Sequence, residues 1–293
     1  MYYRQKVLLS LLQHLGGKVK NTDFQKYLFL FTKNSNKNYY HFVPYKYGCF
    51  SFISYADKRT LTKYGILENE ELWVLKRNVD YLSMLRDVDR DLIIQFKKSF
   101  GHLKRRRLIR HIYSNYPYYA INSEIARKHM SKKQLTTIKN SRNTDNSTKM
   151  FTIGYEGRTL DEYLNILIKN NVRLLCDVRK NAISRKYGFS KKKLKKVTGE
   201  VNIKYEHIPD LGIESNQRKE AIQKSNYEKL FKEYLSHVYN SKQRQISYIK
   251  ELLRKYRRIA LTCFEQDHSM CHRSKIIEAL TKLSDLDCPV SNL

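Results

Sequence analysis

The sequence has no long apolar run, and this absence excludes a membrane-spanning protein. A membrane-spanning helix needs about 18 or more predominantly apolar residues in succession, and no stretch of the 293 residues approaches that length. The N-terminal stretch places positive residues before an apolar run. However, Gln13 and His14 interrupt that run and no small-residue cleavage site follows. We therefore expect an amphipathic helix of a soluble protein and no membrane partner.

Cysteines are few, and their number and spacing exclude a disulfide framework. The five cysteines are scattered through the chain, and an odd number over this length is not the pattern of a disulfide-stapled secreted domain. Reduced thiols are typical of the cytoplasm, so we expect a cytoplasmic protein.

Acidic residues are scarce compared with basic ones. The chain has 57 Lys and Arg against 28 Asp and Glu, a net charge of +29. Residues 1–150 hold 29 basic and 11 acidic side chains and residues 151–293 hold 28 and 17, so both halves are basic. Such a charge attracts polyanions, and we expect nucleic acid as the partner, DNA rather than RNA. A lysine-rich genome that inflates surface lysine is the alternative explanation.

The polar composition of the middle of the chain predicts two domains. Residues 137–148, "TIKNSRNTDNST", contain no aromatic residue, which is typical of a linker. We expect a basic, mainly helical domain over 1–136, a linker over 137–149 and an α/β domain over 150–293.

The first half has the pattern of a winged helix. Apolar spacing predicts a helix over about 7–15, and another over 21–32 with Asn21 or Thr22 as its N-cap. After breaks at Pro44 and Gly48 we expect a helix over 51–64 and a strand at 71–75, then one or two helices over 80–120. This order is that of a winged helix-turn-helix, and the pattern resembles winged-helix-like domains of antitoxin and phage-defence proteins. A helical adaptor that binds protein is the alternative.

The densest basic run, "KRRRLIRH" at 104–111, is a candidate phosphate contact. A solvated helix face is the alternative explanation. Tyrosines 113, 116, 118 and 119 lie beside it and could stack on bases, but we expect them to fill the core. The expected nucleic-acid contacts are Lys104, Arg105, Arg106, Arg107 and Arg110.

The second half alternates between strand and helix patterns, which predicts a Rossmann-like, mainly parallel sheet covered by helices. Unusual polar motifs follow each of the first four strands, namely "GYEGR", "DVRKNAISRKYGFS", "HIPDLGIES" and "CFEQDHSMCHR". Since ligands bind at the carboxyl ends of parallel strands, we expect one site there. The expected strands cover 150–155, 172–178, 203–208 and 258–264, and the expected helices cover 159–171, 190–200, 226–240, 242–256 and 271–283.

These motifs also resemble a known family. "TIGYEGRTLDEYL", "LLCDVRKNAISRKYGFSKKKL", "YEHIPDLGI" and "CFEQDHSMCHRS" are similar, over about residues 150–283, to the family called domain of unknown function 488. Its members carry Asp-Val-Arg, a downstream Ser-Arg and a Cys-x-Glu…Cys-His-Arg signature. Here these are Asp177-Val178-Arg179, Ser184-Arg185, Cys263-Phe264-Glu265 and Cys271-His272-Arg273. The chain departs from the family at Ile213, where many members have glycine, and at Tyr187, where members often have proline. The resemblance implies a Rossmann-like domain in a cytoplasmic setting, often near nucleic-acid processing, but no established chemistry.

The residue types at the sheet edge point to an anion and to acid–base chemistry. Arginine forks and a helix N-terminus favour a phosphate-bearing ligand. Carboxylates can act as acid and base, and a cysteine at a helix start beside arginines is a candidate nucleophile with a lowered pKa. The alternatives are that carboxylates pair with arginines and that the cysteine packs under the loop. Expected catalytic residues are Asp177, Glu265, Cys271 and Glu156, and expected ligand-binding residues are Tyr155, Arg158, Arg179, Ser184, Arg185, His207, His272 and Arg273.

A metal site is the weaker reading of the same residues. The spacing Cys-x4-His-x2-Cys-His matches no common zinc pattern, and adjacent Cys271 and His272 should point in different directions. We therefore expect no metal and no cofactor.

The sequence predicts a nucleic-acid-associated protein whose C-terminal domain hydrolyses a glycosidic or phosphodiester bond in nucleic acid or a nucleotide. The N-terminal domain would recruit the substrate. A ligand-sensing DNA-binding regulator, or a non-catalytic adaptor in a toxin–antitoxin or defence complex, is the alternative. A homo-oligomer and a defence-system partner also stay open.

Overall fold

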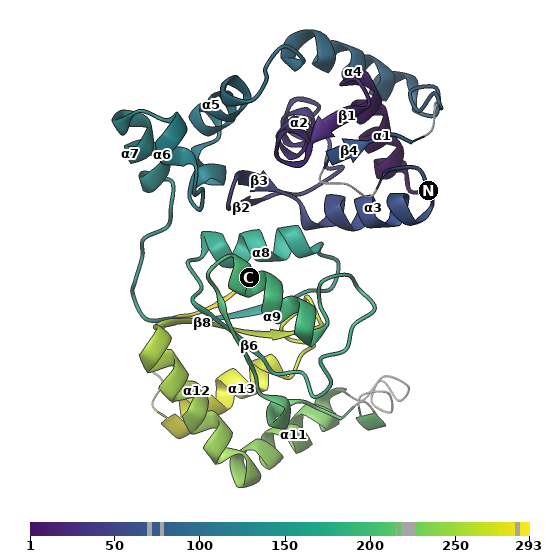
Figure 1. The fold of residues 1–293 in the computed structure, drawn as a ribbon. Coiled ribbons are helices and arrows are strands. Elements are labelled where there is room, and N and C mark those ends of the chain that lie inside the picture. The colour runs from purple at the N-terminus through teal and green to yellow at the C-terminus, as the bar shows by residue number, and fades with distance from the viewer. Residues whose placement is uncertain (69–71, 77–78, 215, 218–226, 285–287) are drawn as a thin grey trace. The chain divides into compact units, whose positions relative to one another are not determined.

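The computed structural model describes residues 1–68, 72–76, 79–214, 216–217, 227–284 and 288–293. The chain forms two compact units, Met1–Arg142 and Asn143–Leu293 (Figure 1), and each contains its own hydrophobic cluster. Residues 137–140, which the polar composition assigned to a linker, are the last residues of a helix of the first unit.

The first unit is mainly helical. Its helices are α1 (Tyr3–His14), α2 (Asn21–Asn34), α3 (Phe52–Lys63), α4 (Asp87–Phe100), α5 (Arg106–Asn115), α6 (Ala126–His129) and α7 (Lys132–Asn140), with a 3-10 turn at Pro117–Ala120. Its strands are β1 (Lys18–Lys20), β2 (Val43–Tyr45), β3 (Gly48–Phe50) and β4 (Leu72–Val74).

The expected helices over 7–15, 21–32 and 51–64 are confirmed as α1, α2 and α3, and the region 80–120 contains α4 and α5. The strand expected at 71–75 is observed as β4, which pairs antiparallel with β1; its first expected residue, Glu71, lies outside the described residues. The N-cap of α2 is Lys20, so the expectation of Asn21 or Thr22 was wrong by one or two positions.

The hairpin β2–β3 was not anticipated, because Pro44 and Gly48 were expected only to break the chain. Pro44 pairs with Cys49 across this hairpin. Gly48 has a φ of +100°, and a Cβ there would lie 2.7 Å from the ring of Tyr113. The hairpin therefore depends on tertiary packing against Tyr113, which local sequence does not show.

The second unit is an α/β domain. Its elements are β5 (Lys149–Gly154), α8 (Leu160–Lys169), β6 (Leu174–Asp177), α9 (Lys191–Glu200), β7 (Lys204–His207), a 3-10 turn (Pro209–Leu211), α11 (Tyr227–Ser241), α12 (Gln243–Tyr256), β8 (Arg258–Cys263), α13 (Arg273–Ser284) and β9 (Val290–Asn292). The four expected strands and five expected helices are all present; Asn226, the first residue of one expected helix, lies outside the described residues. Strand β9 was not anticipated.

The sheet of the second unit has the order β7-β6-β8-β5-β9, and the described strands all pair in parallel. Helices cover both of its faces. Apolar residues of α11, α12 and α13 pack on one face, against side chains such as Leu174, Cys176 and Leu261. Helix α8 lies on the other face (Figure 1), where Tyr163 donates a hydrogen bond to Thr262 at 2.7 Å. The α/β class with a parallel sheet is confirmed.

Side chains at the helix starts of the second unit differ in their roles. Thr159 and Glu162 form a capping box at the start of α8, which satisfies two of its unpaired N–H groups. Ser190 precedes α9, but its hydroxyl donates to the carbonyl of Ser184 at 3.0 Å and makes no capping bond. The serine therefore fixes the segment before α9. Of the helices that the structure describes, none is both long and apolar enough to cross a membrane.

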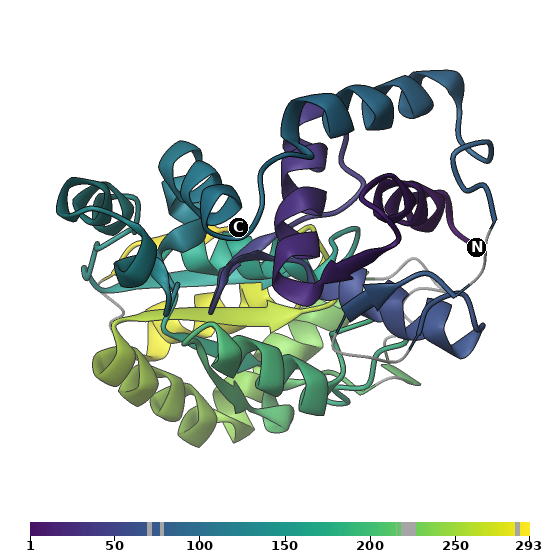
Figure 2. The same ribbon diagram turned by 45° about the horizontal axis from the view of Figure 1, so that its top comes forward.

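The two views of the fold (Figures 1 and 2) show that the strands of the second unit run side by side, and close backbone contacts hold the loops at one edge of this sheet. A Cβ on Gly154, the last residue of β5, would lie 1.7 Å from the carbonyl oxygen of Glu265. A Cβ on Gly212 would lie 2.0 Å from the backbone nitrogen of Lys180. Both positions require glycine because the atoms in the way belong to the backbone and cannot rotate aside.

We predict that Gly154→Ala destabilises the protein by about 2 kcal/mol or more, because the added methyl group overlaps a backbone carbonyl. Gly199→Ala is the matched control, since nothing lies within 4 Å of its Cβ position and it is in helix α9. It should stabilise the protein by up to about 1 kcal/mol. Urea unfolding followed by circular dichroism measures both. Equal effects of the two substitutions would contradict the observed packing at Gly154.

Candidate functional site

The carboxyl ends of the central strands meet at one edge of the sheet. The strand register aligns Asp177 of β6 with Thr262 of β8 and with His207 of β7, and aligns Gly154 of β5 with Cys263 of β8. The polar residues expected at the site follow these positions directly. We refer to this region as the sheet edge.

Asp177 and Arg179 form a buried ion pair at the sheet edge. The Nε and Nη2 atoms of Arg179 donate to the two carboxylate oxygens of Asp177 at 2.8 and 2.5 Å. The hydroxyl of Tyr205 donates to the same carboxylate at 2.6 Å. The Asp177 side chain is 0% exposed and that of Arg179 is 6% exposed. The pair is therefore fully enclosed by protein.

The remaining donors of Arg179 are also used. Its Nη1 atom donates to the hydroxyl of Tyr155 at 3.0 Å and to the carbonyl of Phe189 at 2.9 Å. Burial alone would lower the pKa of the Arg179 guanidinium, but the hydrogen bonds and charge of Asp177 outweigh burial and raise that pKa. Arg179 and Asp177 thus act as structural partners of each other, as the alternative reading of the sequence had it.

Aromatic stacking fixes the loop after β5. The ring of Tyr155 stacks on Phe189, with 4.4 Å between centroids and 11° between planes. The ammonium group of Lys186 donates to the carbonyl of Tyr155 at 2.9 Å. Ser184 accepts from the backbone N–H of Lys186 at 3.2 Å. The segment between β6 and α9 is therefore held against β5, and Arg185 is exposed on it.

Arg158 and Arg273 differ from Arg179 because each has one buried nitrogen without an acceptor among the residues that the structure describes. Arg273 is 1% exposed; its Nε contacts the Sγ of Cys271 at 3.2 Å and its Nη2 donates to the carbonyl of Glu265 at 2.6 Å. Arg158 donates through Nη2 to the main-chain oxygen of Leu293 at 3.0 Å. Within the described part of the chain, the buried Nη1 atom of each arginine has no hydrogen-bond partner.

These two arginines also repel each other. Burial lowers the pKa of the Arg158 guanidinium, and the positive charge of Arg273 lowers it further. Buried donors of like charge are costly unless an acceptor compensates them. An anion that accepts from both Nη1 atoms would relieve this cost, so Arg158 and Arg273 are the better candidates for ligand binding.

Two cysteines and a histidine meet beneath the same loop. The Nδ1 atom of His272 lies 3.8 Å from the Sγ of Cys263 and 3.8 Å from the Sγ of Cys271. The expectation that Cys271 and His272 point in different directions was wrong, because the turn at the start of α13 brings both side chains to Cys263. His207, by contrast, lies apart from them and bonds through Nε2 to the carbonyl of Arg179 at 2.9 Å.

The environment of Cys271 does not favour a nucleophile. Burial raises the pKa of its thiol to about 12, and the neighbouring Cys263 raises it as well. The expectation of a lowered pKa was wrong because desolvation of this 1% exposed side chain outweighs the helix N-terminus and the nearby arginine.

The two glutamates expected at the site, Glu156 and Glu265, lie on adjacent loops, because Glu156 bonds to both chain neighbours of Glu265. Glu156 is exposed, and its Oε2 accepts from the backbone N–H of Gln266 at 3.1 Å. Its own backbone N–H donates to the carbonyl of Phe264 at 2.8 Å. Glu265 is half-buried between these two contacts. Both carboxylates therefore belong to the β5–β8 side of the sheet edge, where Arg158 and Arg273 also lie.

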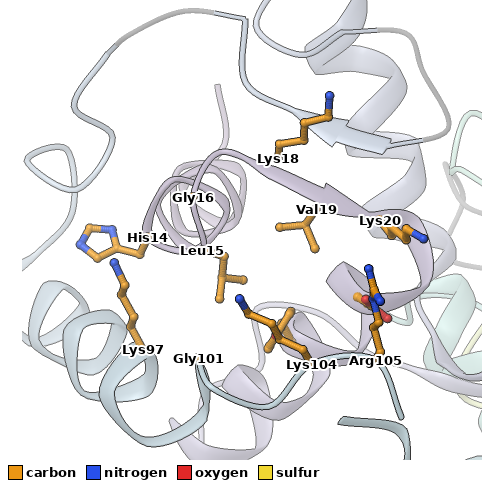
Figure 3. A pocket seen from close by; sticks show the side chains of 12 residues that line it. His14, Leu15, Gly16, Lys18, Val19, Lys20, Lys97, Gly101, Lys104 and Arg105 are labelled. Carbon is orange, nitrogen blue, oxygen red and sulfur yellow. The ribbon is translucent and has the colours of Figure 1, made fainter. Parts of the chain in front are cut away.

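A second candidate site is a pocket of about 500 Å³ in the N-terminal unit, which we call the basic pocket (Figure 3). The end of α1, strand β1, the start of α2 and the end of α4 surround it. Its basic lining residues are Lys18, Lys20, Lys97, Lys104 and Arg105, and Asp23 is the acidic residue among the described lining residues. In Figure 3 Lys104 extends toward Leu15 and Arg105 toward Lys20.

Packing positions the basic side chains of this pocket. The hydroxyl of Tyr27, from α2, donates to the carbonyl of Leu103, and burial raises the pKa of Tyr27 to about 12. This bond holds the segment between α4 and α5 beside α2. Two of the five contacts expected from the basic run, Lys104 and Arg105, therefore line the basic pocket. Arg106, Arg107 and Arg110 are exposed on α5, whose Leu108 and Ile112 are buried.

Sequence reasoning missed several residues of both sites. Lys18, Lys20 and Lys97 join the basic pocket from positions far from the run at 104–111. The "KVK" alternation at 18–20 was a signal that two lysines share one face of a strand. Tyr205, which binds Asp177, gave no signal because its partner depends on how β7 pairs with β6. Tyr113 is in the core, as expected.

We predict that Asp177→Asn lowers the free energy of unfolding by about 3–5 kcal/mol, because it leaves the buried charge of Arg179 uncompensated. The double variant Asp177→Asn/Arg179→Met should lose less than the single variant. Glu214→Gln, in the exposed pair with Lys180 at 3.0 Å, is the control and should cost under about 1 kcal/mol. Urea unfolding measures all three. A loss no larger than that of Glu214→Gln would show that the Asp177 carboxylate does not hold Arg179.

Comparison with known proteins gives one match. Residues 159–280 match the family described as Domain of unknown function DUF488. No curated protein and no solved structure matches the chain. The resemblance expected over about residues 150–283 is therefore confirmed for residues 159–280, which contain the loops after β6, β7 and β8 and the start of α13.

Proposed function

We propose that this protein binds nucleic acid, DNA rather than RNA, through the basic pocket of its N-terminal unit. The observation that carries the proposal is the lining of that pocket, which contains five cationic residues and one carboxylate. A concave surface lined by one sign of charge focuses the electrostatic potential and attracts phosphates. The net charge of +29 adds a long-range attraction for any polyanion.

Two features of the backbone support phosphate binding in this pocket. The first turn of the 14-residue helix α2 lines it, and unpaired N–H groups at a helix N-terminus favour an anion. Arg105 has a φ of +46°, a conformation that costs a non-glycine residue on the order of 1–3 kcal/mol. Such strain is typical of residues that a binding site holds in place.

We propose that the N-terminal unit is a winged-helix-like recruiting domain, similar to those of antitoxin and phage-defence proteins. Helices α1, α2 and α3 and strand β4 follow one another as expected, strand β1 and the hairpin β2–β3 are additional, and β1 and β4 form an antiparallel ribbon. Helix α3 buries Asp57, Lys58 and Leu61 and leaves Arg59, Thr60 and Lys63 exposed. The cationic side chains of the basic pocket would contact phosphates, which gives affinity with little sequence preference.

A second function, hydrolysis of a glycosidic or phosphodiester bond at the sheet edge, is favoured by the grouping on its β5–β8 side. Glu156 and Glu265 lie there with Arg158 and Arg273, whose Nη1 atoms have no hydrogen-bond acceptor among the described residues. The arginines would bind a phosphate and a carboxylate would activate water. Asp177 is no longer a candidate for this step, because its carboxylate is enclosed by Arg179 and Tyr205. Without turnover, the same arginines would make a phosphate sensor.

We predict that the purified protein binds a labelled DNA duplex with an affinity that falls steeply as salt rises. Lys104→Ala/Arg105→Ala should weaken binding about 10-fold or more. It should also reduce the slope of log K against log salt by up to about 2, since each phosphate contact contributes about 0.9. Fluorescence anisotropy at several salt concentrations, with duplex DNA, single-stranded DNA and RNA of one sequence, measures both.

The control for this prediction removes the same charge elsewhere in the unit. Lys132→Ala/Lys133→Ala changes two exposed lysines of α7 that do not line the basic pocket, and it should leave affinity and slope nearly unchanged. Equal losses in the two double variants would show that net charge, and not the pocket, is responsible. Absence of binding at low salt would refute the proposal.

For the second function we predict a product when the protein is incubated with modified and unmodified DNA, RNA and nucleotides, read by mass spectrometry. Glu265→Gln or Glu156→Gln should remove the product while DNA binding stays intact, because the basic pocket is unchanged. No product from any substrate, with phosphate still raising the melting temperature of the wild-type protein, would favour the sensor over the enzyme.

A further inference from the structure

The cluster of Cys263, Cys271 and His272 has the composition of a metal site. One possible ligand atom from each residue, two sulfurs and the Nδ1 of His272, lie within 4.8 Å of one another. All three side chains are buried, at 1%, 1% and 3% exposure, and the cysteines form no disulfide. Two thiolates and an imidazole are the ligands that zinc and similar borderline-soft ions prefer.

The distances within the cluster suit a tetrahedral ion. Ligand atoms in a tetrahedral site with bonds of about 2.0–2.3 Å lie about 3.5–3.8 Å apart. The Nδ1 of His272 is 3.8 Å from each sulfur, and the two sulfurs are no more than 4.8 Å apart. Small rotations of the cysteine side chains would bring all three atoms to bonding distance of one ion.

A second observation concerns the other nitrogen of His272. Its Nε2 lies 3.1 Å from the carbonyl oxygen of Val178. A carbonyl only accepts, so Nε2 carries the proton and the lone pair of Nδ1 faces the two sulfurs. This is how a metal-binding histidine is normally oriented, with its outer N–H held by a carbonyl or carboxylate.

The surroundings of Cys271 also match a metal-bound thiolate. The Nε of Arg273 donates to its sulfur at 3.2 Å, while Nη2 of the same arginine holds the carbonyl of Glu265. A guanidinium donor to sulfur is favourable when the sulfur is negative. The edge of the Tyr234 ring packs on His272, with 5.6 Å between centroids, and closes the cluster on that side.

We propose that Cys263, Cys271 and His272 bind one zinc-type divalent ion at the end of β8. Among the described residues no further His, Cys, Asp or Glu joins the cluster, so a non-protein ligand takes the remaining tetrahedral position. The ion joins the end of strand β8 to the start of α13 and thereby holds the loop 264–270. This site is independent of the proposed function and could be present whether or not the protein is an enzyme.

The competing explanation is a plain hydrogen-bonded cluster of thiols and imidazole. In that case one thiol would donate to Nδ1 at 3.8 Å and a hydrogen bond would join Cys263 and Cys271. A single ion engages all three atoms at once. The sequence argued against a metal because Cys271 and His272 were expected to point in different directions. In the structure the Nδ1 of His272 is 3.8 Å from the sulfurs of both Cys263 and Cys271.

The test is to refold the tag-free full chain with one equivalent of Co²⁺ or Zn²⁺. With Co²⁺ we expect thiolate-to-metal charge-transfer absorption and the intense d–d bands of a tetrahedral site. With Zn²⁺ we expect one bound ion per chain, and X-ray absorption should find two sulfur and at least one nitrogen neighbour. These measurements use the wild-type chain, so they decide the matter even if the variants fold poorly.

The variants Cys263→Ser, Cys271→Ser and His272→Gln should each lower metal affinity more than about 100-fold, since loss of a merely supporting contact already costs about 10–100-fold. Cys288→Ser removes a half-buried cysteine outside the cluster and should retain full binding. The proposal is overturned if wild-type protein shows no tetrahedral cobalt spectrum, if zinc has no sulfur neighbours, or if Cys271→Ser leaves the spectrum unchanged.

Discussion

The buried ion pair between Asp177 and Arg179 is the contact on which the sheet edge depends. Through Arg179 it connects the end of β6 to Tyr155 after β5, and through Asp177 it connects to Tyr205 of β7. A buried pair costs a large desolvation energy and is tolerated only when its hydrogen bonds are satisfied. Here each nitrogen of the Arg179 guanidinium has an acceptor, so the pair holds the ends of β5, β6 and β7 in fixed positions.

The sheet edge has different properties on the two sides of the Asp177–Arg179 pair. On the β6–β7 side the carboxylate of Asp177 and the guanidinium of Arg179 are bonded to each other and are buried. On the β5–β8 side Arg158 and Arg273 keep buried donors without acceptors in the described chain, and the cysteine–histidine cluster lies beside Arg273. We therefore propose ligand binding on the β5–β8 side, because each nitrogen of the Arg179 guanidinium already has an acceptor.

The two units use positive charge differently. In the N-terminal unit the four lysines and Arg105 of the basic pocket are exposed around a cavity of about 500 Å³, an arrangement that suits an extended polyanion. In the C-terminal unit Arg179 and Arg273 are buried, and their hydrogen bonds give their donors defined directions, which suits a single phosphate group. The proposed roles follow from this difference, with affinity assigned to the first unit and selectivity to the second.

The sequence by itself determined helices α1 to α5, the parallel α/β class of the second half and the placement of polar motifs after its strands, but not β1, the hairpin β2–β3, α6, α7 or β9. The former follow from hydrophobic periodicity and capping residues, which act over a few neighbouring positions, as at Thr159 and Glu162. Only the tertiary structure decided which charges pair and which stay open. Arg179 and Arg273 look alike in sequence, but one meets Asp177 and the other does not. Tertiary structure also decided that Cys263 and His272 meet. The turn before α13 brings them together, and the spacing of residues along the sequence does not show the path of that turn.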